Sequence, residues 1–145
     1  MNIVKNTKVK SVGAVLGGLA VAAIASSAVD SVLQATGALP TGHIYASVPM
    51  VLTVVTYRTV FNVLGAYVAA RLAPARPLAH ALGLGIFGSI GSLVTAIATW
   101  NMEIGPHYYP LTLAALGVPA AYAGATLAAR HRVRATAPVV APALA

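Results

Sequence analysis

Cysteine is absent from this chain, and acidic residues are almost absent. Without cysteine there is no disulfide, no thiolate nucleophile and no cysteine metal site. Only Asp30 and Glu103 are acidic, which leaves too few acids and bases for most hydrolytic chemistry. The sequence contains no HExxH motif, nucleophile elbow or phosphate-binding loop. These absences predict a protein that is not an enzyme and that holds no cofactor.

Charge of either sign is scarce. Charged residues make up 8% of the 145 positions and hydrophobic residues 59%, whereas a soluble domain is usually about 25% charged. Three stretches carry no charge when histidine is counted as neutral: residues 11–29, 77–102 and 104–129. Each is long enough for the roughly 20 apolar residues that span a bilayer as a helix. Composition therefore predicts an integral membrane protein.

Four membrane helices fit the chain. We expect an all-α integral membrane four-helix bundle with spans at about residues 12–34, 49–70, 78–99 and 109–129, and a disordered tail at 135–145. The breaks GALPTGH, LAPARP and EIGP all contain proline or glycine, as turns require. The runs are rich in Ala and Leu and lack the in/out alternation of a membrane β-barrel strand. No room is left for a second domain.

Basic residues mark one side of the predicted membrane. Eight of the nine Lys and Arg residues precede the first span, lie between the second and third, or follow the fourth. The positive-inside rule then places both termini in the cytoplasm, and the aromatic residues Trp100, Tyr108 and Tyr109 fall at the opposite interface. The basic residues form no patch with interleaved aromatics, so no nucleic-acid partner is expected. The expected environment is the lipid bilayer.

The N-terminus has an alternative interpretation. MNIVKNTKVK, then an apolar run, then AIASSAVD, resembles a signal peptide with a small-residue cleavage site. Cleavage after Ala25 or Ala28 would leave three spans. Against this, the apolar run is on the long side for a signal peptide, and an internal match between the two halves of the chain needs the first span.

That internal match links the ends of two spans. GAYVAAR, residues 65–71, ends the second span, and GATLAAR, residues 124–130, ends the fourth; GHIYASVP and GPHYYP precede the same spans. Two tandem helical hairpins in one orientation would be related by an axis along the membrane normal. The alternative is coincidence, because short matches arise easily in an alanine-rich chain.

One positive charge lies inside a predicted span. Arg58 belongs to VTYRTVFNVLGAY, residues 55–67, and lies roughly 10 Å below the outer edge of the hydrocarbon core at 1.5 Å of rise per residue. Asp30 lies about 3–5 Å below the same edge. Because an arginine side chain reaches toward the interface, we expect an interhelical Asp30–Arg58 ion pair. The expected polar neighbours are Ser27, Ser31, Gln34, Tyr57 and Asn62.

The pair admits two functional interpretations. As a clamp, it fixes helix register in a non-enzymatic accessory or structural membrane protein, which acts through a membrane-protein partner or as a homo-oligomer. As a functional site, it belongs to a small transporter or channel, working as a dimer, with a polar cavity around Asp30, Arg58 and Asn62. The pair is shallow, whereas a transport site usually gathers more polar groups near the midplane, so the clamp is preferred.

Small residues indicate where helices approach one another in lipid. They recur at helical spacing on three of the predicted spans, where we expect them to face other helices of the same bundle. Pro119 should kink the fourth helix, because proline removes a backbone donor. The rows are Gly13, Gly17 and Ala20; Ala81, Gly85 and Ser89; Gly88, Ser92 and Ala96; and Ala114, Gly117, Ala121, Gly124 and Ala128.

The outer loops hold the candidate metal ligands. His43, Glu103 and His107 would form a small His/carboxylate site if the two outer loops met. A Gly-Pro pair between Glu103 and His107 makes a shared helix unfavourable, so the signal is weak and we predict no metal. His131, among the last arginines, is expected to be solvated.

Two segments carry a resemblance. YRTVFNVLGAYVAARLAPARPLAHALGLG, residues 57–85, and GPHYYPLTLAALGVPAAYAG, residues 105–124, resemble a set of small, uncharacterised four-span bacterial inner-membrane proteins. The most specific pieces are Tyr57-Arg58, the turn at 65–77 with His80 after it, and the turn at 105–110. Tyr108 departs from the pattern, since relatives often carry Trp there, and both suit an interface. The resemblance implies four spans and a bacterial inner membrane, and it implies no activity.

Overall fold

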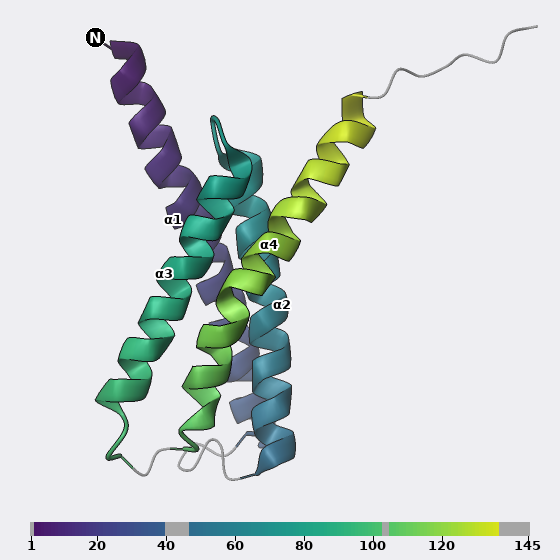
Figure 1. Ribbon diagram of the computed structural model, residues 1–145. Helices are drawn as coiled ribbons and strands as arrows, with labels where there is room; N and C mark the ends of the chain where they lie inside the picture. Colours follow the sequence, from purple (N-terminus) through teal and green to yellow (C-terminus); the bar gives the residue numbers. More distant parts are fainter. Residues whose placement is uncertain (1, 40–46, 103–104, 137–145) are drawn as a thin grey trace, which may run out of the picture.

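Four long helices make up the structure, a computed structural model that describes residues 2–39, 47–102 and 105–136 (Figure 1). Helix α1 is Asn2–Ala35, α2 is Val48–Leu72, α3 is Pro77–Ala98 and α4 is Tyr108–Thr136. All four are long and apolar enough to cross a membrane. The predicted all-α bundle with four candidate spans is therefore confirmed.

The first and last helices extend beyond the predicted spans. Helix α1 begins at Asn2 rather than near residue 12, and α4 continues to Thr136. Neither extension contains proline or glycine, and its Lys, Arg and Ala residues favour helix. Two residues of the predicted disordered tail at 135–145 thus belong to α4, and residues 137–145 lie outside the described part of the chain.

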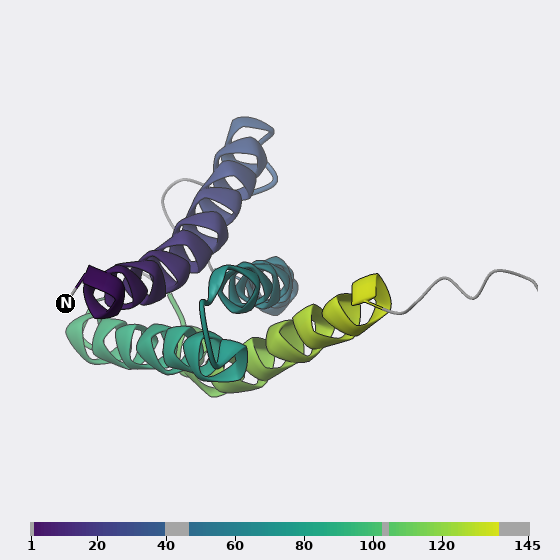
Figure 2. The ribbon, with the colours of Figure 1, turned by 90° about the horizontal axis from the view of Figure 1, so that it is seen from above.

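Helix α2 occupies the centre of the bundle. It packs against all three other helices, whereas α1 and α4 do not touch each other within the described residues. Seen from above, α2 stands between α1 and α4 (Figure 2). The start of α1, the α2–α3 turn and the end of α4 lie at one end of the molecule (Figure 1).

The two hairpins, α1–α2 and α3–α4, are not arranged symmetrically. A two-fold axis relating them would require an α1–α4 contact to match the contact between α2 and α3. Helices α2 and α3 are in contact, whereas no contact between α1 and α4 is present among the described residues. Any repeat in the sequence is therefore not reproduced in the packing.

Alanine fills the core. Small side chains let helix backbones approach closely in lipid, where the hydrophobic effect does not draw helices together. Large apolar side chains such as Ile86, Phe87 and Ile97 point outward instead. No polar or charged residue is fully buried in the described part of the chain. The central cluster contains Ala66, Ala69, Ala70, Ala81, Leu84, Ala121, Ala125 and Ala128.

A glycine pair brings the helices of each hairpin into backbone contact. Gly18 of α1 faces Gly65 of α2, and a Cβ atom at Gly65 would lie 2.5 Å from the Gly18 carbonyl oxygen. Gly85 of α3 faces Gly117 of α4, and a Cβ atom at Gly85 would lie 2.8 Å from the Gly117 carbonyl oxygen. A larger residue at any of these positions would push two helices apart.

The predicted contact row on α1 was wrong by one residue. The buried row is Ala14, Gly18 and Ala22, whereas a Cβ atom at Gly13 would meet no atom within 4 Å and one at Gly17 would meet only the Leu72 side chain. A shift of one residue turns the contact face by about 100°. Both faces of α1 carry small residues, so the position of α2 decides which is used. On α3 and α4 the rows through Gly85 and Gly117 do face each other.

Helix α4 bends as predicted and then reaches the end of α2. It changes direction along its length (Figure 1), and Pro119 lies within it, as expected where a backbone donor is missing. Beyond the bend, the Arg132 guanidinium donates to the carbonyl oxygens of Ala70 and Arg71 at 2.9 and 3.0 Å. His131 is exposed, but its Nδ1 also lies 3.1 Å from the hydroxyl oxygen of Tyr67.

Candidate functional site

Asp30 and Arg58 form the predicted interhelical ion pair. Arg58 Nη2 lies 2.5 Å from Asp30 Oδ2. The Arg58 side chain is 31% exposed and the Asp30 side chain is 24% exposed. Helices α1 and α2 are antiparallel neighbours, so a residue near the end of α1 lies beside the first half of α2. Partial burial lowers the local dielectric constant and strengthens the attraction compared with water. The pair therefore ties α1 to α2.

Tyr57 binds the other oxygen of the same carboxylate. Its hydroxyl donates a hydrogen bond to Asp30 Oδ1, while Arg58 donates to Oδ2. Two consecutive residues of α2 thus converge on one side chain of α1. Hydrogen bonds to an ionised acceptor are stronger than neutral ones, and they satisfy both oxygens of Asp30. Tyr57, expected as a polar neighbour, is a direct partner of this carboxylate.

Tyr109 of α4 also lies close to Arg58. The guanidinium carbon is 6.0 Å from the centroid of the Tyr109 ring, near the outer limit for a cation–π contact. The sequence placed Tyr109 only in an interfacial aromatic belt. The position of Tyr109 in the sequence fits both a belt tyrosine and a tyrosine beside Arg58. The packing of α4 on α2 decides which of the two it is. Three helices therefore meet at Arg58.

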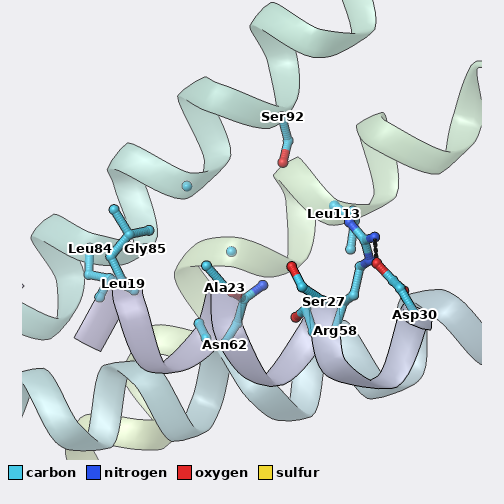
Figure 3. Close-up of a pocket in the computed structure, with 14 residues that line it drawn as sticks. Leu19, Ala23, Ser27, Asp30, Arg58, Asn62, Leu84, Gly85, Ser92 and Leu113 are labelled. Carbon is cyan, nitrogen blue, oxygen red and sulfur yellow. Dashed lines mark hydrogen bonds and ion pairs between the residues drawn. The ribbon is translucent and has the colours of Figure 1, made fainter. Parts of the chain in front are cut away.

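A pocket of about 320 Å³ opens beside the ion pair (Figure 3). Asp30 and Arg58 lie at one end of it, and Leu19 and Leu84 lie at the other. It forms because α1, which packs mainly on α2, leaves space between itself, α3 and α4. All four helices supply its walls. The lining residues are Leu19, Ala22, Ala23, Ser26, Ser27, Asp30, Arg58, Asn62, Leu84, Gly85, Gly88, Ser92, Leu113 and Gly117.

The predicted polar neighbours divide into two groups. Ser27 and Asn62 line the pocket beside the pair. Ser31 donates its hydroxyl hydrogen bond to the Ser27 carbonyl oxygen at 2.8 Å, and Gln34 is exposed near the end of α1.

Sequence reasoning missed two serines of the pocket. Ser26 and Ser92 also line it. Ser26 directly precedes Ser27, which was an available signal. Ser92 was assigned to a helix-packing row, and only the divergence of α1 from α3 leaves it beside an open space.

The candidate metal ligands do not form a described site. His43 and Glu103 lie outside the described residues. The His107 ring stacks on Trp100 with centroids 4.4 Å apart, and its Nε2 lies 2.7 Å from the Trp100 carbonyl oxygen. Within the described ranges, no group of three His, Asp or Glu residues is placed to hold a metal ion. In this structure His107 links the two ends of the α3–α4 connection.

Comparison with family models, curated proteins and solved structures finds no match for this chain. The resemblance to small four-span proteins is therefore supported at one level only, that of four long apolar helices. The chain is a multi-pass helical membrane protein with an Asp30–Arg58 salt bridge between its first two helices.

Proposed function

We propose that the protein is a non-enzymatic accessory or structural membrane protein in which the Asp30–Arg58 pair clamps α1 to α2. The observation that supports this is the attachment of α1. This helix packs on α2, touches α3 much less, and does not touch α4 within the described residues. Near the end of α1, the contacts to Tyr57 and Arg58 hold it to the bundle. For a helix with only one main neighbour, such a clamp adds a second point of attachment besides the Gly18–Gly65 contact.

The proposed location is a bacterial inner membrane, with both termini in the cytoplasm. The start of α1 and the end of α4 lie at the same end of the bundle (Figure 1). Lys8, Arg71 and Arg132 belong to segments at that end, which is the distribution that the positive-inside rule associates with the cytoplasm. The resemblance to bacterial four-span proteins supports the choice of membrane.

A second candidate is a small transporter or channel, working as a dimer. The pocket that contains Asp30, Arg58 and Asn62 favours it, because a cavity lined by these residues is what that function requires. The clamp function is still preferred, since α1 and α3 close the inner end of the pocket. There a Cβ atom at Gly18 would lie 2.9 Å from Leu84 Cδ1.

Liposome swelling distinguishes the two functions. The purified protein is reconstituted, and the vesicles are challenged with glycerol, urea and small sugars under an osmotic gradient. An accessory protein leaves permeability at the level of protein-free vesicles, and a transporter or channel raises it. In the second case, the variant Asp30→Asn with Arg58→Gln should fold and lose the permeability. Light scattering in detergent reports whether a dimer is present, which the second function requires.

A further inference from the structure

The serine and asparagine side chains of the pocket differ from the threonine side chains of the spans. Thr53, Thr56 and Thr95, which are exposed, each donate a hydrogen bond to the carbonyl oxygen four residues earlier. This satisfies a hydroxyl group that faces lipid. In the pocket, the side chains of Asn62 and Ser92 make no hydrogen bond to any described residue. Their donors and acceptors are available to an occupant.

Ser26 and Ser27 belong to the same group. Both line the pocket from α1, and neither side chain makes a hydrogen bond within the described part of the chain. An amide and three hydroxyl groups that find no partner among the described residues are costly at membrane depth unless water or a polar ligand satisfies them. The pocket is therefore built to hold hydrogen-bonding groups.

The charged side chains are confined to one end of the pocket, where Leu113 also lies beside Arg58 (Figure 3). The ion pair and Ser27 lie toward one end, and Leu19 and Leu84 lie toward the other (Figure 3). The polar end is the one toward which α1 ends, and therefore the one nearer the membrane surface. The apolar end lies deeper in the bundle. This is also the order in which the head and chain of a membrane lipid are arranged in one leaflet.

The pocket can be reached from lipid between α1 and α3. These helices meet near Gly18 and Leu84 and then diverge (Figures 1 and 2). On the α3 side, Gly88 contributes no side chain, and a Cβ atom there would meet no atom within 4 Å. A molecule in the bilayer can therefore enter sideways.

We propose that this pocket binds an amphiphile from the surrounding bilayer, with an uncharged, hydroxyl-bearing head at the Asp30–Arg58 end and the first part of its chain at the Leu19–Leu84 end. The head is uncharged because Asp30 and Arg58 already compensate each other, and a charged head would add an uncompensated charge at membrane depth. The hydroxyl and amide groups at Ser26, Asn62 and their neighbours suit a polyol head. The volume of about 320 Å³ is at the small end of the range for ligand sites, so the rest of the chain stays in lipid.

Occupancy of the pocket is independent of the clamp and of transport. The clamp concerns the stability of α1 against α2, whereas the inference concerns occupancy of the space beside it. If the clamp were intact and the pocket empty, ligand binding would be contradicted and the clamp function would stand.

Gly88 and Gly91 provide a matched pair of test variants. Both lie on α3, and a Cβ atom at either would meet no atom within 4 Å. Gly88 lines the pocket and Gly91 does not. Gly88→Leu should therefore fill the pocket without displacing a helix, while Gly91→Leu adds the same side chain outside it. Circular dichroism and thermal unfolding check that both variants fold like the wild type.

Binding is measured by native mass spectrometry with monolauroyl glycerol as the probe. The protein is held in an amine oxide detergent, whose head carries no hydroxyl group, at one fixed concentration, so that competition from its alkyl chain is the same for every variant and probe. We expect saturable binding of one probe, weakened at least about tenfold by Gly88→Leu and unchanged by Gly91→Leu. Equal binding by both variants would mean an annular lipid and would overturn the proposal.

Two further probes test the chemistry of the head and the need for a chain. Lauryl phosphate carries a twelve-carbon chain, as monolauroyl glycerol does, on a charged head, and free glycerol carries the head without a chain. Both should bind at least about tenfold more weakly than monolauroyl glycerol. Tighter binding of lauryl phosphate would mean an anion site, and equal competition by glycerol would mean a site for soluble polyols; either result would overturn the proposal.

A hydroxyl variant separates recognition from simple filling. Ser92→Ala removes a hydroxyl group from the pocket, and Thr95→Val removes one that donates to the Gly91 carbonyl oxygen on the same helix. We expect Ser92→Ala to weaken binding of monolauroyl glycerol and Thr95→Val to leave it unchanged. If both have no effect, the head is not recognised through its hydroxyl groups, and the proposed class of ligand is wrong.

Discussion

Arg58 Nη2 lies 2.5 Å from Asp30 Oδ2, and this contact joins α2 to the C-terminal part of α1. Along α1 the pair is about 18 Å from the contact of Gly18 with Gly65, at 1.5 Å of rise per residue. One point of attachment would let α1 swing about it. Two points at this separation fix both the register and the direction of the helix.

Loss of one member of this pair should destabilise the bundle. Arg58→Ala leaves the Asp30 carboxylate partly buried without its cation, and Asp30→Ala leaves Arg58 without its anion. Breaking a buried pair typically costs about 3–5 kcal/mol, and this partly exposed pair should cost about 1–3 kcal/mol. Thermal unfolding in detergent, followed by circular dichroism, measures the effect.

The double variant Asp30→Asn with Arg58→Gln should recover much of that loss, because a neutral hydrogen bond replaces the ion pair. Asp30→Ala should be the milder single change if the Arg58 side chain extends to water. A double-mutant cycle with alanine at both positions measures the coupling directly. A coupling energy near zero would show that the two side chains do not interact.

Tyr57→Phe should also destabilise the protein, since it removes the hydrogen bond to Asp30 Oδ1 while keeping the ring. A hydrogen bond to a charged group contributes about 1.5–3 kcal/mol, and partial exposure should place this one at the lower end. The matched control is Tyr122→Phe in α4, because Tyr122 is 57% exposed. Equal unfolding temperatures for the two variants would contradict the role of Tyr57.

Gly85→Leu should separate α3 from α4, because a Cβ atom there would already lie 2.8 Å from the Gly117 carbonyl oxygen. Overpacking of this kind costs about 1–3 kcal/mol or more. Gly91→Leu on the same helix is the control and should be tolerated. Gly37 is unsuitable as a control, since its φ of 72° strains any larger residue. Equal tolerance at Gly85 and Gly91 would mean that α3 packs through another face.

Arg132→Ala should loosen the junction between α4 and the end of α2. Its guanidinium donates to the carbonyl oxygens of Ala70 and Arg71, which have no partner further along their own helix. We expect a loss of about 1 kcal/mol and faster amide exchange in the last turn of α2. Arg134→Ala removes a similar charge from an exposed position and should have little effect. The same exchange rates in both variants would argue against this capping role.

The absence of cysteine makes topology directly measurable. Single variants Gly105→Cys and Ala75→Cys place one thiol in each of two connections. A membrane-impermeant maleimide added to intact cells should label Gly105→Cys, and it should label Ala75→Cys only after permeabilisation. The reverse pattern would place the termini outside. A mature chain that begins at Ser26 or Val29, seen by mass spectrometry, would show instead that the first span is removed.

The sequence by itself determined the class of protein and its main electrostatic contact. Three long uncharged stretches, and a fourth interrupted only by Arg58, leave few alternatives to four apolar helices, because an unpaired backbone is costly in lipid. Asp30 was the only acidic residue near the depth of Arg58, so scarcity of charge identified the partner. For the same reason, a chain with more acidic residues would not have revealed the pair.

Only the tertiary structure decided which faces of the helices meet. Small residues cover more than one face of α1, so spacing alone favoured Gly17 where the contact is Gly18. The approach of Tyr109 to Arg58 and the exposure of Ser92 in a pocket depend on the angles at which α4 and α1 cross their neighbours. Those angles follow from the closest backbone contacts among all four helices together, and no single helix encodes them.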